Sequence, residues 1–130
     1  MPFDGTDFTG RQLMLTKLAD VRRLLDTEDK WCKKHFRMWD GRYCILGALM
    51  SARAKSLLYD LILASIHDVT RGRYRTVVQF NDSPVTQHRL IVAVLDRARY
   101  RILVGQIPPA VTYQASLLRK IAGAFRFRET

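Results

Sequence analysis

One cysteine and one histidine have surroundings that could make them a nucleophile and its base. Cys44 stands at the start of a predicted helix, where the helix dipole would stabilise a thiolate. His88 follows Asn81 and Asp82, either of which could orient an imidazole ring. Together these four residues indicate a small cysteine-dependent hydrolase or transferase. The alternative, which we favour, is a buried thiol, a core histidine bonded to a carbonyl, and an aspartate that caps a helix.

Zinc binding is a second chemistry that these residue types could support. Cys32 and His35 have the spacing of one ligand pair. Folding could add Cys44 and either His67 or His88. Structural zinc sites usually contain two closely spaced pairs, so we predict no metal site. The chain also lacks a phosphate-cradling glycine loop, a dinucleotide-binding fingerprint and a serine nucleophile elbow, and no cofactor is predicted.

Two basic segments carry aromatic residues among their charges. The cations are Lys33, Lys34 and Arg37 in the first segment and Arg71, Arg73 and Arg75 in the second, and the aromatic residues are Trp31, Phe36, Trp39 and Tyr74. Lysine and arginine neutralise phosphates, and aromatic rings stack on exposed bases. Both segments therefore indicate a nucleic-acid interface. The alternative is that Lys33 and Lys34 form a solvated face of a hairpin while the aromatic rings belong to the core.

The charge of the chain also favours an acidic partner. The 130 residues carry a net charge of +10, and they suit one domain. The first thirty residues hold six acids and five bases, whereas the remaining hundred hold seventeen bases and six acids. No apolar run approaches the roughly 20 residues that cross a bilayer, and the N-terminus lacks the pattern of a signal peptide. With only two cysteines, the chain is expected to be cytoplasmic, with no integral membrane association.

Helices must position these side chains, because the apolar residues recur at helical spacing. The predicted fold class is mainly α, a compact bundle of about five helices with a short hairpin or turn near residues 34–43. The expected helices cover approximately residues 9–26, 43–53, 54–68, 84 to 100 or 103, and 110–125, and a short extended or helical segment covers residues 76–80. Asp40-Gly41 is a turn signal, and the nearby aromatic rings are expected to cap one end of the core. The small pair Gly47-Ala48 predicts close helix–helix packing.

The start of the fourth helix is marked by Asn81-Asp82-Ser83-Pro84. Aspartate or serine can cap a helix, and proline suits its first position because its missing amide hydrogen would be unpaired there. The expected inward face of this helix is Val85, His88, Val92, Leu95 and Ile102, with Ile91 and Ala98 beside it.

Several short motifs follow a recurrent order along the chain. They are Trp31, the segment Cys44-Ile45-Leu46-Gly47-Ala48-Leu49, the pair Asn81-Asp82 with His88, and Leu95-Asp96-Arg97-Ala98. This order resembles a family of small bacterial and phage-borne proteins that is known only as a domain of unknown function. The resemblance covers approximately residues 13–100, implies a helical fold and leaves the function open. Members often carry tryptophan before the Asn-Asp pair, where this chain has Phe80.

These observations predict a single helical domain over residues 1–130, with a basic helix at about residues 110–125 beyond the family-like region. That helix has more apolar residues than one stripe requires, which favours docking on a partner or self-association. The predicted function is binding, with a protein partner or self-association preferred and nucleic acid as the other candidate. The cysteine-dependent enzyme is the alternative function.

Overall fold

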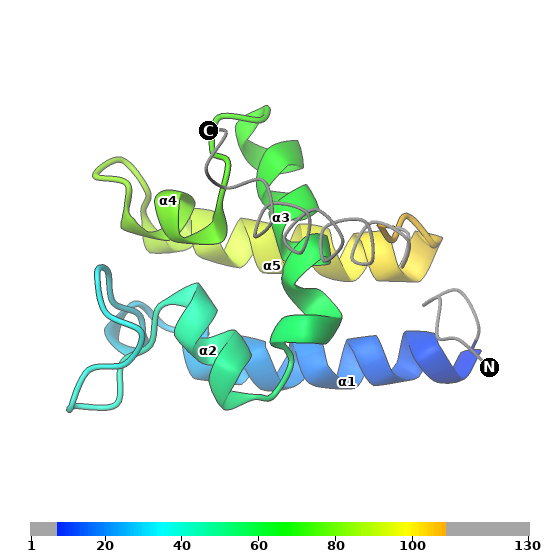
Figure 1. The fold of residues 1–130 in the computed structure, drawn as a ribbon, viewed down its shortest axis with the longest axis horizontal. Helices are drawn as coiled ribbons and strands as arrows, with labels where there is room; N and C mark the ends of the chain where they lie inside the picture. Colours follow the sequence, from blue (N-terminus) through cyan, green and yellow to red (C-terminus); the bar gives the residue numbers. More distant parts are fainter. Residues whose placement is uncertain (1–7, 109–130) are drawn as a thin grey trace, which may run out of the picture.

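The structure is a computed structural model that describes residues 8–108, and this part of the chain is mainly helical, as predicted (Figure 1). Its elements are α1 (Phe8–Leu25), the 3₁₀ turn η1 (Glu28–Lys30), α2 (Ile45–Ser51), α3 (Lys55–Thr70), α4 (Val77–Asp82) and α5 (His88–Val104). The helix expected at residues 110–125 lies outside the described residues.

Three long helices form the framework of the fold. α1 and α5 run antiparallel to each other, and α3 crosses between them (Figure 1). Each helix buries apolar residues that recur at intervals of three and four, which places them on one face. The buried residues are Met14, Leu18, Val21 and Leu25 on α1, Leu58, Leu61, Ile62 and Ile66 on α3, and Ile91, Val94, Leu95, Ala98 and Ile102 on α5.

The expected start of the fourth helix at Pro84 is wrong. The backbone at residues 77–82 already forms α4, whose N-cap Thr76 accepts a hydrogen bond from the Gln79 amide at 3.1 Å. Ser83 is the C-cap of α4, and its carbonyl accepts from the Thr86 amide at 3.1 Å to make a turn. The short segment at residues 76–80 is thus largely helical, and the capping residues end a helix where a start was expected.

The inward face of α5 differs from the prediction for the same reason. Because α5 begins only at His88, Val85 lies in the preceding turn and is 56% exposed. Val92 is only partly buried, and Val94, which was not expected on this face, is buried in its place. Ile91 and Ala98, expected beside the face, are fully buried. Leu95 and Ile102 face inward as expected.

The segment between η1 and α2 contains the predicted turn. The Met38 amide donates to the Arg42 carbonyl at 2.7 Å, and the Gly41 amide donates to the Met38 carbonyl at 2.9 Å. Gly41 has a φ of +91°, which glycine adopts without strain. Among residues 8–108 there are isolated bridges at Tyr43 but no strands, so the turn forms without a regular hairpin.

The aromatic residues of this segment do not all cap the core. Trp31 is buried, whereas Phe36 is 55% exposed and Trp39 is 94% exposed. The expectation that all of them cover one end of the core is therefore wrong for Phe36 and Trp39. Within residues 8–108, no helix is both long enough and apolar enough to cross a membrane.

Candidate nucleic-acid interface

The position of the first basic segment is set by one buried amide side chain. Asn81 is 1% exposed, and its Oδ1 accepts hydrogen bonds from Trp31 Nε1 at 2.8 Å and from the Ile45 amide at 3.0 Å. Its Nδ2 donates to the Cys32 carbonyl at 3.1 Å and to Asp82 Oδ1 at 2.9 Å. Asn81 thereby ties α4 to both ends of the segment 31–45, which we call the aromatic loop.

A second attachment joins the aromatic loop to the end of α4. Asp82 Oδ1 also accepts from the Lys34 amide at 2.8 Å, and Lys34 has the positive φ of 69°. Lys33 Nζ donates to the Ser83 carbonyl at 2.7 Å and lies 5.4 Å from the centre of a Trp31 ring. Asp82 therefore caps a loop amide, and the expectation that it caps the following helix is wrong.

The loop backbone also lies directly against α2. A Cβ atom added to Gly47 would be 1.8 Å from the Phe36 carbonyl oxygen, a distance that real atoms do not reach. The same carbonyl accepts a hydrogen bond from the Cys44 amide at 3.2 Å. The small pair predicted close helix–helix packing, but Gly47 instead admits the backbone of the aromatic loop.

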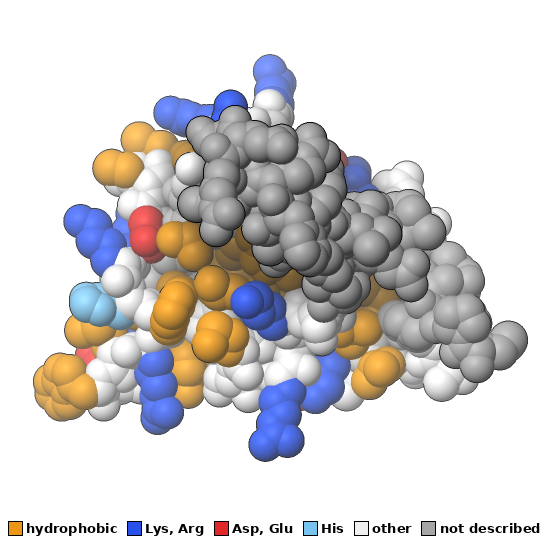
Figure 2. Space-filling view, in the orientation of Figure 1, with side chains coloured by type: hydrophobic (Ala, Val, Ile, Leu, Met, Phe, Trp, Pro, Cys, Tyr) orange, Lys and Arg blue, Asp and Glu red, His pale blue; other side chains and the backbone are white. Residues whose placement is uncertain are grey.

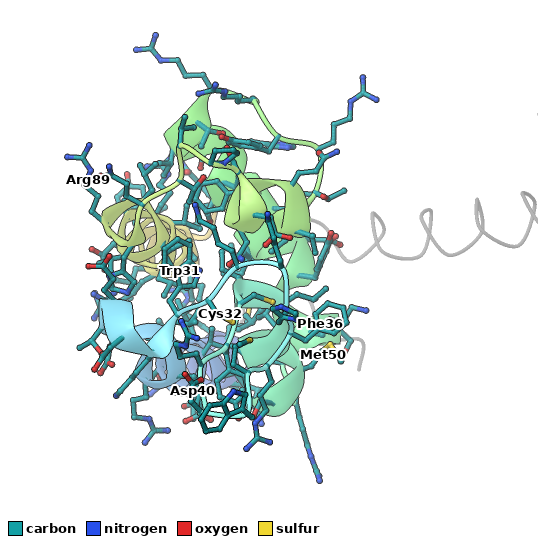
Figure 3. The ribbon with its side chains drawn as sticks, turned by 90° about the vertical axis from the view of Figure 1, so that its left-hand side faces the viewer. Trp31, Cys32, Phe36, Asp40, Met50 and Arg89 are labelled. Carbon is teal, nitrogen blue, oxygen red and sulfur yellow. The ribbon has the colours of Figure 1, made fainter. Side chains whose placement is uncertain are left out.

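These attachments hold two aromatic rings at the surface. Phe36 and Trp39 are 55% and 94% exposed, and Lys34 and Arg37 beside them are exposed as well. Figure 3 shows Phe36 and Asp40 at the outer edge of the loop, while Trp31 and Cys32 lie further inside. On the face in Figure 2, Lys and Arg side chains project around clusters of exposed hydrophobic side chains. The loop thus presents rings and cations on a backbone that is fixed from within.

The second basic segment meets the first at Tyr74. The Tyr74 hydroxyl donates to Ser83 Oγ at 2.9 Å, and the Arg73 guanidinium lies 5.7 Å from the centre of the Tyr74 ring. The hydrogen bond with Ser83 lowers the pKa of the Tyr74 hydroxyl, and the positive charges of Arg73 and Lys33 lower it further. The two segments, which start 38 residues apart in sequence, therefore form one positively charged region.

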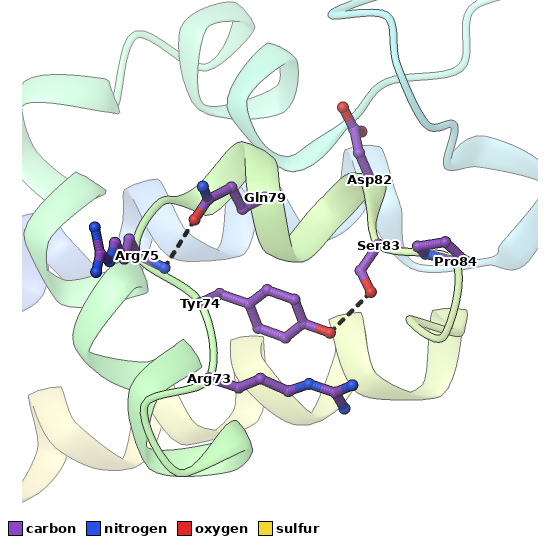
Figure 4. A pocket seen from close by; sticks show the side chains of 7 residues that line it. All are labelled: Arg73, Tyr74, Arg75, Gln79, Asp82, Ser83 and Pro84. Atoms are coloured by element: carbon purple, nitrogen blue, oxygen red, sulfur yellow. Dashed lines mark hydrogen bonds between the residues drawn. The ribbon is translucent and has the colours of Figure 1, made fainter.

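A pocket opens at this meeting point. Its volume is about 550 Å³, and Figure 4 shows the lining residues, Arg73, Tyr74, Arg75, Gln79, Asp82, Ser83 and Pro84. Gln79 Oε1 accepts from the Arg75 amide at 3.0 Å, which holds the segment against α4. Ser83, Gln79 and Asn81 were not predicted as parts of such a site. The only sequence signal was that Trp31 and Asn81 both belong to the motif order described above.

The cations of both segments are free of carboxylates in the described part of the chain. The ion pairs there involve other bases, namely Arg22, Arg23, Lys30, Arg42, Arg97 and Arg101. Lys33, Lys34, Arg37, Arg71, Arg73 and Arg75 form none of them. Their charge is therefore available for an anionic partner.

Cys44 and His88 are engaged with different partners. Cys44 is the N-cap of α2, at the helix start where it was predicted, and its Sγ accepts from the Gly47 amide at 3.2 Å. Burial nevertheless raises the pKa of the Cys44 thiol, outweighing the helix amides that lower it. His88 Nε2 lies 2.7 Å from the Leu25 carbonyl oxygen, and its ring stands 6.0 Å from that of Trp31. No hydrogen bond joins Cys44 to His88 in the described structure.

The residues considered for zinc are likewise bonded elsewhere. Cys32 Sγ donates to the His35 carbonyl at 3.4 Å, so the backbone of His35 is what the thiol contacts. His67 Nε2 lies 2.8 Å from the Tyr74 carbonyl oxygen. Between residues 8 and 108, no three His, Cys, Asp or Glu side chains are grouped to hold a metal ion.

Comparison with known proteins identifies one family. The model of DUF6197, described as a family of unknown function, matches residues 11–101. This range contains both basic segments, Asn81 and the pocket. No curated protein and no solved structure matches the chain significantly.

Proposed function

The chain belongs to the DUF6197 family, a family of unknown function, and we propose that it binds single-stranded nucleic acid through the aromatic loop and the segment 71–75. The observation that carries this proposal is the 94% exposure of Trp39 on a loop whose backbone is fixed by Asn81 and Asp82. Burying such a ring would contribute about 1.5–3 kcal/mol or more to stability. The Trp39 ring stays in solvent without this stabilisation, on a surface that also carries exposed cations.

Single strands fit this surface better than a duplex. Their bases have free faces, which stack on aromatic side chains at about 1–3 kcal/mol per base. In a duplex the bases are already stacked, and sequence is then read by a helix or a two-stranded ribbon placed in the major groove. The aromatic loop offers neither of these elements, because it contains no strand and its exposed rings lie on irregular backbone.

The free cations supply the electrostatic part of the proposal. Each phosphate contact on a single strand contributes about −0.7 to the slope of log K against log salt. Contacts from all six cations would therefore give a slope of about −4. The net charge of +10 also steers acidic ligands toward the protein before contact.

The test is fluorescence anisotropy with labelled oligo(dT) and oligo(U) across a salt series, compared with a hairpin duplex. The proposal expects tighter binding of the single strands and a slope that Arg37→Ala reduces by about 0.7. Arg99→Ala removes the same charge from an exposed position on α5 and should leave the slope unchanged. Absence of single-strand binding at low salt would refute the proposal.

A protein with an acidic surface is the second candidate partner. It is favoured by the exposure of Phe36 and Met50, 55% and 48%, because aromatic residues and methionine are enriched at protein interfaces. Failure of nucleic acid to bind would make this partner the leading candidate. The cysteine-dependent enzyme stays a prediction, and the reactivity of Cys44 decides it.

A further inference from the structure

The pocket beside Tyr74 has the composition of a phosphate site. It is a shallow depression of about 550 Å³ that lies largely open to solvent. Figure 4 shows the Arg73 side chain running alongside Tyr74, so that the guanidinium ends near the hydroxyl group. The Tyr74 ring is held in place by an edge contact with Phe80, 5.5 Å between ring centroids. The Tyr74 ring and its hydroxyl group are therefore positioned before any ligand arrives.

The hydrogen bond between Tyr74 and Ser83 leaves one hydroxyl group that can donate to an anion. The Tyr74 hydroxyl donates to Ser83 Oγ at 2.9 Å. A serine hydroxyl has one proton and two acceptor positions, and its proton rotates to suit the partner. With Tyr74 as the donor of this bond, Ser83 has its own proton to donate to an anion. A guanidinium and a hydroxyl donor in the lining of one pocket match the oxygens of a phosphate group.

The electrostatic balance of the pocket is positive. Arg73 and Lys33 both act on the Tyr74 hydroxyl, and Lys33 Nζ is fixed at 2.7 Å from the Ser83 carbonyl oxygen. The one carboxylate of the lining, Asp82, points away from Tyr74 and Ser83 in Figure 4. Its Oδ1 is occupied by the Lys34 amide and by Asn81 Nδ2. The side of the pocket that holds the hydroxyl groups therefore faces cations.

We propose that this pocket binds the terminal phosphate monoester of a nucleic-acid strand. A monoester carries a charge of about −1.5 to −2 and three acceptor oxygens near neutral pH, whereas an internal diester carries one charge. The monoester is thus the better match for a pocket lined by the Arg73 guanidinium and the Ser83 hydroxyl, with the Lys33 ammonium bonded to the Ser83 carbonyl. The hydrogen bonds of Lys33 and Lys34 join this pocket to the aromatic loop, so one strand can contact both. The inference rests on the proposed function and names the strand end that the site prefers.

The experiment compares one oligonucleotide sequence with a 5′-phosphate, a 3′-phosphate or hydroxyl groups at both ends. The inference expects one phosphorylated form to bind about tenfold more tightly than the hydroxyl form, and the two phosphorylated arms identify the end. Ser83→Ala and Arg73→Gln should each lower this ratio, whereas Arg99→Ala should preserve it. Thermal melting of each variant verifies that it is folded.

The outcomes separate the two proposals. Equal binding of all three forms overturns the phosphate site and leaves single-strand binding intact. If no strand binds, the proposed function fails, and titration with thymidine 5′-monophosphate, followed by NMR at the Ser83 amide, tests the pocket by itself. A saturable shift at Ser83 would support a phosphate site, and no shift would overturn it.

Discussion

The replacement Gly47→Ala separates local helix propensity from the packing of the aromatic loop. Alanine is favoured over glycine in a helix interior by about 1 kcal/mol, so propensity alone predicts stabilisation. The structure predicts the opposite, because the new Cβ would lie 1.8 Å from the Phe36 carbonyl oxygen and 2.6 Å from its carbonyl carbon. Both atoms belong to the backbone, so the loop must move as a unit.

The magnitude follows from three contributions. Overpacking in a well-packed region costs about 1–3 kcal/mol. Displacement of Phe36 also removes the hydrogen bond from the Cys44 amide, a net loss of about 0.5–1.5 kcal/mol. After the propensity gain of about 1 kcal/mol is subtracted, the variant should be less stable by about 0.5–3.5 kcal/mol. Because Phe36 moves with the loop, the affinity for single strands should also fall.

Urea unfolding followed by circular dichroism measures this change. The control is Thr16→Ala, at an exposed position in the interior of α1, where alanine brings a propensity gain and no clash. We expect the midpoint of the control to rise or stay constant and that of Gly47→Ala to fall. A Gly47→Ala protein that is more stable than the parent chain would refute the packing of the loop against α2.

Three further predictions follow from buried or charged side chains. Asn81→Ala leaves Trp31 Nε1 and the Ile45 amide without an acceptor, so it should lower the free energy of unfolding by about 2–6 kcal/mol in a urea titration. Burial and a raised pKa should make Cys44 react with iodoacetamide at neutral pH at least about tenfold more slowly than it does in urea, as followed by mass spectrometry. Asp68→Asn should destabilise the protein at neutral pH, and progressively less as the pH falls to 2 and below. Hydrogen bonds from Arg101 and Arg97 lower the pKa of Asp68 from 3.8 to about 2, so its contribution is complete above about pH 4 and is lost as the pH falls through 2.

Each of these predictions has an outcome that contradicts it. Trp31→Phe removes the indole donor to Asn81 and keeps an aromatic ring. The double variant Trp31→Phe/Asn81→Ala should therefore lose less free energy of unfolding than the sum of the losses in the two single variants. A loss equal to that sum would contradict the hydrogen bond between Trp31 and Asn81. Fast alkylation of Cys44 that His88→Ala slows would favour the enzyme over a buried thiol. A constant stability difference between pH 2 and 7 would show that Asp68 does not titrate with the pKa that its arginine partners impose.

The long helices could be predicted from the sequence because their signal is local. Leu18, Val21 and Leu25 recur at helical spacing, and so do the buried residues of α3. The start of α5 could not be predicted in the same way. Ser83 and Pro84 are suited to a helix start, but Asn81 is held by Trp31, fifty positions earlier in the chain. This tertiary contact keeps residues 81 and 82 in α4 and moves the next helix to His88.

The candidate site was predictable in its residue types but not in its arrangement. Lysine, arginine and aromatic residues in two short segments indicated contacts with phosphates and bases. The exposure of Phe36 and Trp39 could not be derived from composition, because aromatic residues are usually at least partly buried. Their exposure follows from the place of the loop backbone, which the absent side chain of Gly47 and the amide of Asn81 determine.

The most direct test of the central claim is the affinity of Trp39→Ala for a single-stranded oligonucleotide at fixed salt. Leu103→Ala is the matched control, because Leu103 is an apolar residue of α5 that is 43% exposed away from the loop. Loss of stacking on one base should weaken binding about 5- to 150-fold for Trp39→Ala, with no change for the control. Equal affinities of Trp39→Ala, Leu103→Ala and the parent protein would contradict the claim that the aromatic loop binds single-stranded nucleic acid.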